Sequence, residues 1–254
     1  MSTNIKVIRF TSILSLILSI LTYAISLNIA YDWCEWKWLS NDFLLTFFGG
    51  AFASMAVVLI CEIQKYLQNK KECCEQLFLH TSYIYAQLFS LNYTLSELIA
   101  NPDARIYTTN INRYLETTKY EIGIIDRIDL SVFLKKSQLN IQHSMYHKWL
   151  HKVLAMFLNE CVYIDMAVNT DKINNLKQFK TEGVITSSSP TTGSVLKKLQ
   201  PKFSSLLVFV NKYLEFLDNY SENKYNWKQK KENIECSVHI KIGSINDYLK
   251  SDLK

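Results

Sequence analysis

The sequence predicts an all-α fold, in which an N-terminal two-span transmembrane helical hairpin is followed by a cytoplasmic helical bundle. Three observations lead to this prediction. Only 3 Pro and 6 Gly occur in 254 residues, too few for the turns of a β-sandwich, a barrel or a Gly-loop nucleotide fold. Two long uncharged segments lie near the N-terminus. After them, apolar residues recur at helical spacing through most of the chain.

The two uncharged segments are the predicted membrane spans. Residues 10–30 carry no charge over 21 positions, and residues 43–61 carry none over 19. A helix of about 20 apolar residues crosses about 30 Å of hydrocarbon, so both are long enough. A signal peptide fits the first segment less well, because the apolar run is too long and no small-x-small cleavage site follows it. We therefore expect a hairpin over residues 1–63 and a cytoplasmic domain over residues 64–254.

The segment between the spans predicts an interfacial belt and an orientation. Amphipathic aromatic rings favour the headgroup layer, and the segment supplies four: Tyr31, Trp33, Trp36 and Trp38. It carries one Lys and three acidic residues, whereas two basic residues precede the first span and three lysines closely follow the second. The positive-inside rule then places both termini in the cytoplasm and the aromatic segment outside.

Each span has a face of small or hydroxyl side chains. In the first span, five hydroxyls at spacings of 3, 4, 3 and 4 share one helix face: Ser12, Ser15, Ser19, Thr22 and Ser26. In the second span, small residues form two small-xxx-small pairs: Gly49 with Ala53 and Gly50 with Ser54. Two interpretations stay open. The faces pack the hairpin or bond to their own carbonyls, or the hydroxyl stripe meets other copies in an oligomer and lines a wet path.

The remaining chain predicts a bundle. One helix runs from the second span to Asn101-Pro102, with an apolar face at Leu77, Ile84, Leu88, Leu91, Leu95 and Leu98. Further helices are expected over residues 103–122, ended by Gly123, over residues 131–169 with a break near Lys135, and from Pro201 to Trp227. A mobile loop is expected near residues 181–194, a short strand after Glu235, and a last helix opened by a capping box of Ser244 and Asp247.

No catalytic motif stands out. His143, His147 and His151 lie four residues apart on one helix face, and a pair at this spacing can share one zinc ion. All three span about 12 Å, too far for one ion, and no Glu follows His143. We read the three histidines as an ordinary helix face. The sequence contains no C-x-x-C, P-loop or G-x-S-x-G motif, so we predict no catalytic, metal or cofactor site, no cofactor and no enzyme activity.

Two strings in the N-terminal region, DWCEWKWLSNDFLLTFFGG and VVLICEIQKY, carry a resemblance. Over residues 1–70, the chain resembles the two-transmembrane effectors of bacterial anti-phage systems, notably those paired with retrons. The resemblance implies a toxic effector of abortive infection in the bacterial inner membrane. It also implies that a reverse transcriptase with its nucleic-acid product restrains the effector until phage attack. From the hydroxyl and small-residue faces of the spans, we expect the effector to act as a homo-oligomer in the lipid bilayer. The alternative is a non-toxic membrane-anchored scaffold or signalling module.

Overall fold

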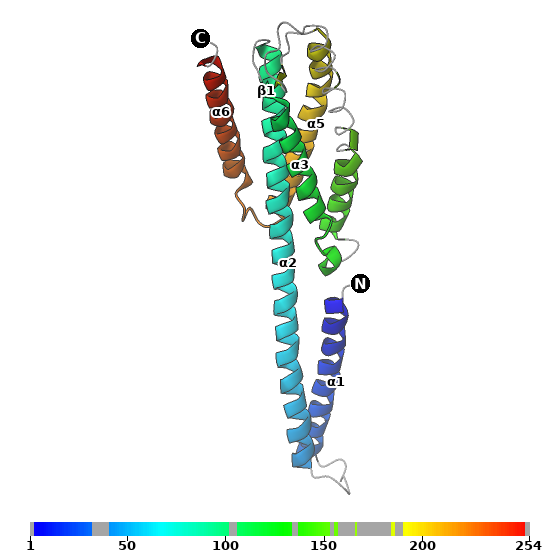
Figure 1. Ribbon diagram of the computed structural model, residues 1–254. Coiled ribbons are helices and arrows are strands. Elements are labelled where there is room, and N and C mark those ends of the chain that lie inside the picture. Colours follow the sequence, from blue (N-terminus) through cyan, green and yellow to red (C-terminus); the bar gives the residue numbers. More distant parts are fainter. Residues whose placement is uncertain are drawn as a thin grey trace. The chain divides into compact units, whose positions relative to one another are not determined.

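The computed structural model describes residues 3–31, 41–101, 106–133, 137–152, 155–156, 166, 184–185 and 190–251. These residues are almost entirely helical (Figure 1). The elements in chain order are α1 (Thr3–Tyr31), α2 (Asn41–Ala100), β1 (Ile106–Tyr107), α3 (Thr108–Ile125), the 3₁₀ helix η1 (Leu130–Val132), a helix over residues 138–152, β2 (Val184–Ile185), α5 (Pro190–Tyr220) and α6 (Trp227–Ser251). The predicted all-α class is confirmed for this part of the chain, with one two-residue antiparallel pair, β1 with β2, added to it.

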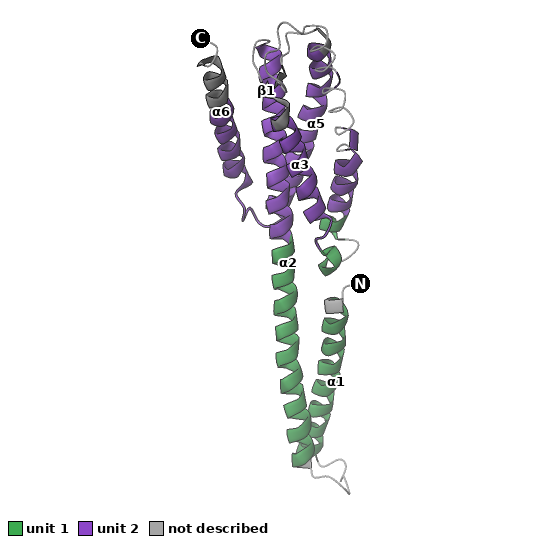
Figure 2. Cartoon of the chain, viewed as in Figure 1, with its two compact units in different colours: residues 1–73, 129–140 green, residues 74–128, 141–254 purple. Residues whose placement is uncertain are grey.

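The chain divides into two compact units (Figure 2). Unit 1 comprises residues 1–73 and 129–140, and unit 2 comprises residues 74–128 and 141–254. Helix α2 is 60 residues long and contributes to both. It ends where the sequence predicts. The N–H of Asn101 makes the last bond, to Glu97 O at 2.8 Å, and Pro102 disfavours a helical conformation at the residue before it.

In the described part of the chain, two helices are long and apolar enough to cross a membrane, in the segments Ile5–Tyr31 and Asp42–Ala100. The first lies in unit 1, and the second begins there. Only 17% of the most apolar window of the first is buried within the chain, and 6% of that of the second. The core helix of a soluble domain would be mostly buried. Length, composition and exposure therefore suit both helices to a lipid environment.

The core of unit 2 is built on the predicted apolar face of α2. Its six leucine and isoleucine side chains, from Leu77 to Leu98, are each at most 1% exposed. Other helices add large buried residues, among them Ile122 of α3, Tyr146 of the helix over residues 138–152 and Phe203 of α5. Helix α6 joins through Tyr85 of α2, whose hydroxyl donates to Glu235 at 2.6 Å. Repeated i, i+3 and i+4 spacing is thus what forms this bundle.

Helix α3 differs from the prediction at both ends. It begins at Thr108, because Ile106 and Tyr107 pair with Ile185 and Val184 as β1. It continues through Gly123 to Ile125, since glycine in a helix interior only weakens the helix. Similarly, the predicted helix over residues 131–169 is η1 followed by a helix over residues 138–152. The predicted break near Lys135 and most of the helix beyond residue 152 lie outside the described residues.

Helix α5 also begins earlier than predicted. It starts at Pro190, so Pro190 to Ser194, expected in a mobile loop, form its first turn. The prediction that this helix starts at Pro201 is wrong, because Pro201 lies inside it. An interior proline removes one backbone hydrogen bond, but Leu199 and Phe203 on either side are at most 1% exposed. Their burial holds the helix together across the proline.

The C-terminal prediction is wrong in its secondary structure. Helix α5 ends at Tyr220, and the single helix α6 contains the residues predicted as a strand and as a capping box. Within α6, Val238 and Ile242 are 9% and 5% exposed, while Ile240 is 73% exposed. A strand would place all three on one face. The observed burial follows a helical period of four residues instead.

Candidate functional site

The hydroxyl stripe of α1 lies along the edge of the helix side that is buried within the chain. Ser15 is buried, Ser19 and Thr22 are half-buried, and Ser12 and Ser26 are exposed. The covered side runs through four residues that are 6–8% exposed: Thr11, Ser15, Ile25 and Asn28. The five predicted hydroxyls therefore share a face, but only its inner part is covered within unit 1.

Two of the five hydroxyls bond to their own helix. Ser12 Oγ donates to Ile8 O at 2.7 Å, and Thr22 Oγ1 donates to Leu18 O at 2.8 Å. Such bonds to the carbonyl one turn earlier satisfy a hydroxyl in a medium without water. Ser12 and Thr22 thus bond to their own helix, and the choice between the two interpretations of the hydroxyl stripe stays open.

The small-residue face of α2 is open. Gly50, Ala53 and Ser54 are exposed, and Gly49 is half-buried. A Cβ placed on either glycine would meet nothing within 4 Å in the described part of the chain. Ser54 Oγ donates to Gly50 O at 2.9 Å. The close approach that small residues permit is therefore not made at these glycines by any described segment of this chain.

Of the predicted interfacial belt, the structure describes only Tyr31. It is the last residue of α1 and is 64% exposed. Trp33, Trp36 and Trp38 lie outside the described residues.

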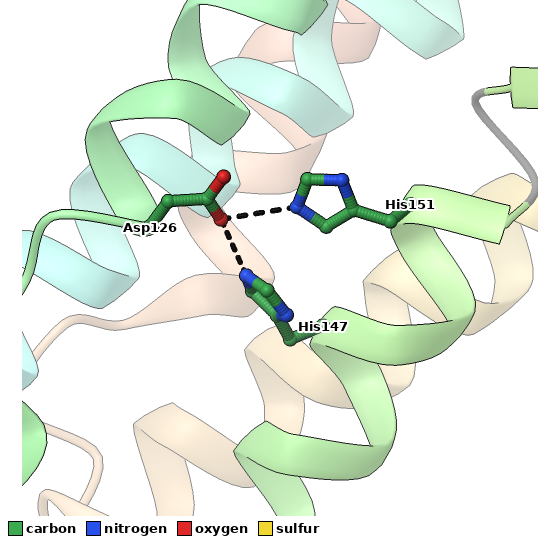
Figure 3. A group of neighbouring side chains, drawn as sticks. All are labelled: Asp126, His147 and His151. Carbon is green, nitrogen blue, oxygen red and sulfur yellow. Dashed lines mark hydrogen bonds and ion pairs between the residues drawn. The ribbon is translucent and has the colours of Figure 1, made fainter.

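Unit 2 contains a second candidate site, made of Asp126, His147 and His151 (Figure 3). Asp126 follows the end of α3, and its N–H donates to Ile122 O at 2.9 Å. The two histidines lie one turn apart on the helix over residues 138–152. His151 Nε2 is 3.0 Å from Asp126 Oδ1, and His147 Nε2 contacts the same oxygen.

The charge state of this Asp–His cluster follows from its contacts. Burial would raise the pKa of Asp126, but the hydrogen bonds from His151 and His147 outweigh it and hold that pKa below its usual value. The carboxylate is therefore ionised at neutral pH. All three side chains are between 35% and 44% exposed, so solutes in water can reach them.

The third histidine of the face has a separate role. His143 is 4% exposed, and its Nδ1 lies 2.7 Å from the hydroxyl of Tyr213 on α5. Burial lowers the pKa of His143 to about 4, so the ring is neutral at physiological pH. The structure thus separates a buried packing histidine from an exposed pair.

Comparison with family models, curated proteins and solved structures found no match for this chain. Its site is therefore interpreted from its own residues.

Asp126 is the residue that sequence reasoning missed. The spacing of His147 and His151 is compatible with a shared ion, but the sequence pattern predicts only an ordinary helix face for these residues. The third group, Asp126, lies 21 residues before His147. An acidic residue near the expected end of a helix was the only available signal, and that signal is not specific.

Proposed function

We propose that this protein is a membrane-embedded toxic effector of an anti-phage, abortive-infection system. It disrupts the bacterial inner membrane when a restraining partner complex releases it. The observation that carries the proposal is the exposure of α1 and α2, whose most apolar windows are 17% and 6% buried. In this proposal the two helices cross the inner membrane as a hairpin with both termini in the cytoplasm.

The open faces of the two helices support assembly into a homo-oligomer. Gly50, Ala53 and Ser54 offer an exposed small-residue surface, and Ser19 and Thr22 lie at the edge of the covered side of α1. In a bilayer, such surfaces associate through close backbone approach and hydroxyl contacts. Neither span carries a charged residue between positions 10–30 or 43–61, which favours general leakage over a proton relay.

The continuity of α2 supports a link between restraint and membrane. One helix runs from Asn41 to Ala100 and supplies both a proposed span and the core face of unit 2. In this proposal a reverse transcriptase with its nucleic acid binds the cytoplasmic domain, and release of that complex frees the spans to associate.

The test is induced expression in bacteria, with membrane potential and viability as readouts. We expect the full chain to depolarise the membrane and a chain lacking residues 1–61 to leave it intact. Co-expression of a cognate reverse transcriptase and its nucleic acid should suppress the effect. If depolarisation stays absent in every combination with its trigger, the effector proposal fails, and a scaffold that merely anchors unit 2 becomes the better explanation.

Matched variants test the role of the helix faces. Ser15→Leu, Ser19→Leu and Thr22→Leu together fill the inner part of the hydroxyl face and should abolish depolarisation. Ile13→Leu, Ile17→Leu and Ile20→Leu change three residues that are 47–60% exposed on the same helix and should leave it unchanged. Equal toxicity of the two triple variants would show that the hydroxyl face has no part in the effect.

A further inference from the structure

We infer that Asp126, His147 and His151 form a binding site for a divalent transition-metal ion of the zinc class. The inference is independent of the proposed function, since all three residues lie in unit 2. Their candidate ligand atoms all lie within 4.8 Å of one another (Figure 3). Among the described residues, no other group of three or more His, Cys, Asp or Glu side chains brings its ligand atoms this close together.

The distances suit a tetrahedral ion. Zinc binds imidazole nitrogen and carboxylate oxygen at about 2.0–2.2 Å, which places neighbouring ligand atoms about 3.3–3.6 Å apart in a tetrahedral site. His151 Nε2 and Asp126 Oδ1 are 3.0 Å apart now, and His147 Nε2 contacts the same oxygen. Binding of an ion therefore requires the two histidine nitrogens to move away from the oxygen that they share, and rotation of these partly exposed side chains allows it.

The ligand types select the metal class. Two imidazoles and one carboxylate favour zinc and its transition-metal neighbours, whereas calcium and magnesium prefer all-oxygen sites. Three protein ligands leave a fourth position for water. His143 does not supply that ligand, because its Nδ1 is engaged with the hydroxyl of Tyr213 and its side chain is buried.

The local charge also favours a cation. Asp126 directly follows the C-terminal end of α3, where the helix dipole is negative, and its own carboxylate adds a full negative charge. Both Nε2 atoms converge on one oxygen, so each must carry a hydrogen to donate to it. A divalent ion would take the place of those two hydrogens between nitrogen and oxygen, and the hydrogen of each neutral ring would move to Nδ1, so that Nε2 binds the ion with its lone pair.

Binding would tie the end of α3 to the helix over residues 138–152. The ligands are 21 and 25 residues apart along the chain, so the ion would close a long segment. An ion that binds only the folded chain stabilises it.

The experiment uses the full-length chain in detergent micelles, with a tag free of histidine and with metal removed by a chelator. Calorimetric titration with zinc chloride should give one ion per chain and a higher midpoint of thermal unfolding. Asp126→Asn, His147→Gln and His151→Gln should each weaken binding by more than about tenfold, the loss that even an outer partner of a metal ligand causes. His239→Gln, which alters an exposed histidine of α6, should bind as the unchanged protein does. No saturable binding, or equal binding by all variants, overturns the inference.

A second measurement does not depend on whether the variants fold. X-ray absorption of the zinc-loaded, unchanged protein should show only nitrogen and oxygen ligands, with the scattering pattern of two imidazoles. Sulfur in the first shell would assign the ion to cysteines and overturn the site. Neither measurement involves membrane potential, so this inference and the effector proposal can fail separately.

Discussion

Asp218 and Trp227 are joined by a buried hydrogen bond that connects the last two long helices. Asp218 Oδ2 accepts the backbone N–H of Trp227, the first residue of α6, at 2.8 Å, and Oδ1 accepts that of Tyr225 at 2.9 Å. The aspartate is 7% exposed, and the first N–H groups of a helix have no partner within the helix. One carboxylate on α5 therefore accepts hydrogen bonds from backbone N–H groups at the start of α6 and just before it. The Trp227 ring in turn packs edge-on against Phe78 and Tyr85 of α2.

Replacing this aspartate should destabilise unit 2. Asp218→Ala leaves two N–H groups without an acceptor, and we expect the free energy of unfolding to fall by about 2–3 kcal/mol. Asp218→Asn keeps one acceptor oxygen and should lose less. Chemical unfolding of the full chain in micelles, followed by far-UV circular dichroism, measures both. Asn219→Ala changes the exposed neighbouring residue and serves as the control. A loss for Asp218→Ala no larger than that of the control would contradict this capping role.

The turn between α5 and α6 contains a backbone conformation that glycine would relieve. Glu222 has φ of 57°, in the left-handed region that is unfavourable by about 1–2 kcal/mol for residues with a Cβ. After allowing for the greater chain entropy of glycine, we expect Glu222→Gly to raise the free energy of unfolding by up to about 1 kcal/mol. Glu232→Gly, at an exposed position inside α6, should lower it by about 1 kcal/mol. Substitution by glycine should thus change the free energy of unfolding in opposite directions at these two positions, which are ten residues apart. A change in the same direction at both would contradict the prediction.

Gly123 lies in the last part of α3, where alanine should give a more stable helix. A Cβ at this position would meet nothing within 4 Å in the described chain, and its backbone is helical. Gly123→Ala should therefore stabilise unit 2 by about 0.5–1 kcal/mol, through lower entropy of the unfolded chain and higher helix propensity. Thermal unfolding of the two proteins side by side measures this. A lower midpoint for the alanine variant would mean that the helix needs glycine here.

The sequence was informative where structure follows local periodicity. The spacing of Leu88, Leu91 and Leu95 sufficed to predict the core face of α2, because side chains three and four residues apart share a helix face whatever packs on it. Likewise, Asn101-Pro102 marked the end of α2 through a local steric effect. The charge-free segments likewise predicted two long apolar helices, because the length and hydropathy of a segment are local properties of the sequence.

Predictions failed where tertiary packing decides between local alternatives. The alternation from Ser237 to Ile242 is compatible with a strand, and only contacts with other helices select the helix that buries Val238. Pro201 is a common first residue of a helix, yet burial of its neighbours keeps it inside α5. The convergence of Asp126 with His147 depends on how two helices lie against each other, for which no local pattern exists.

Alkaline pH should destabilise the contact between α2 and α6. Tyr85 is 3% exposed, and its hydroxyl donates to the Glu235 carboxylate at 2.6 Å. Burial, and next the bond to Glu235, raise the pKa of Tyr85 well above its usual value near 10. Because the folded-state pKa is the higher one, the stabilisation is fully present below about pH 10 and is lost as the pH rises above it.

Tyr85→Phe is the variant that tests this pH dependence. It should lower the free energy of unfolding by about 1.5–3 kcal/mol at pH 7, since a hydrogen bond to a carboxylate is lost. Its stability should then fall less steeply between about pH 9 and 11 than that of the unchanged protein. Tyr83→Phe provides the matched control, because Tyr83 is 48% exposed on the same helix. Denaturant titrations at pH 7 and in this alkaline range give the comparison. If all three proteins lose stability with the same slope, the Tyr85 hydroxyl is not the group that titrates.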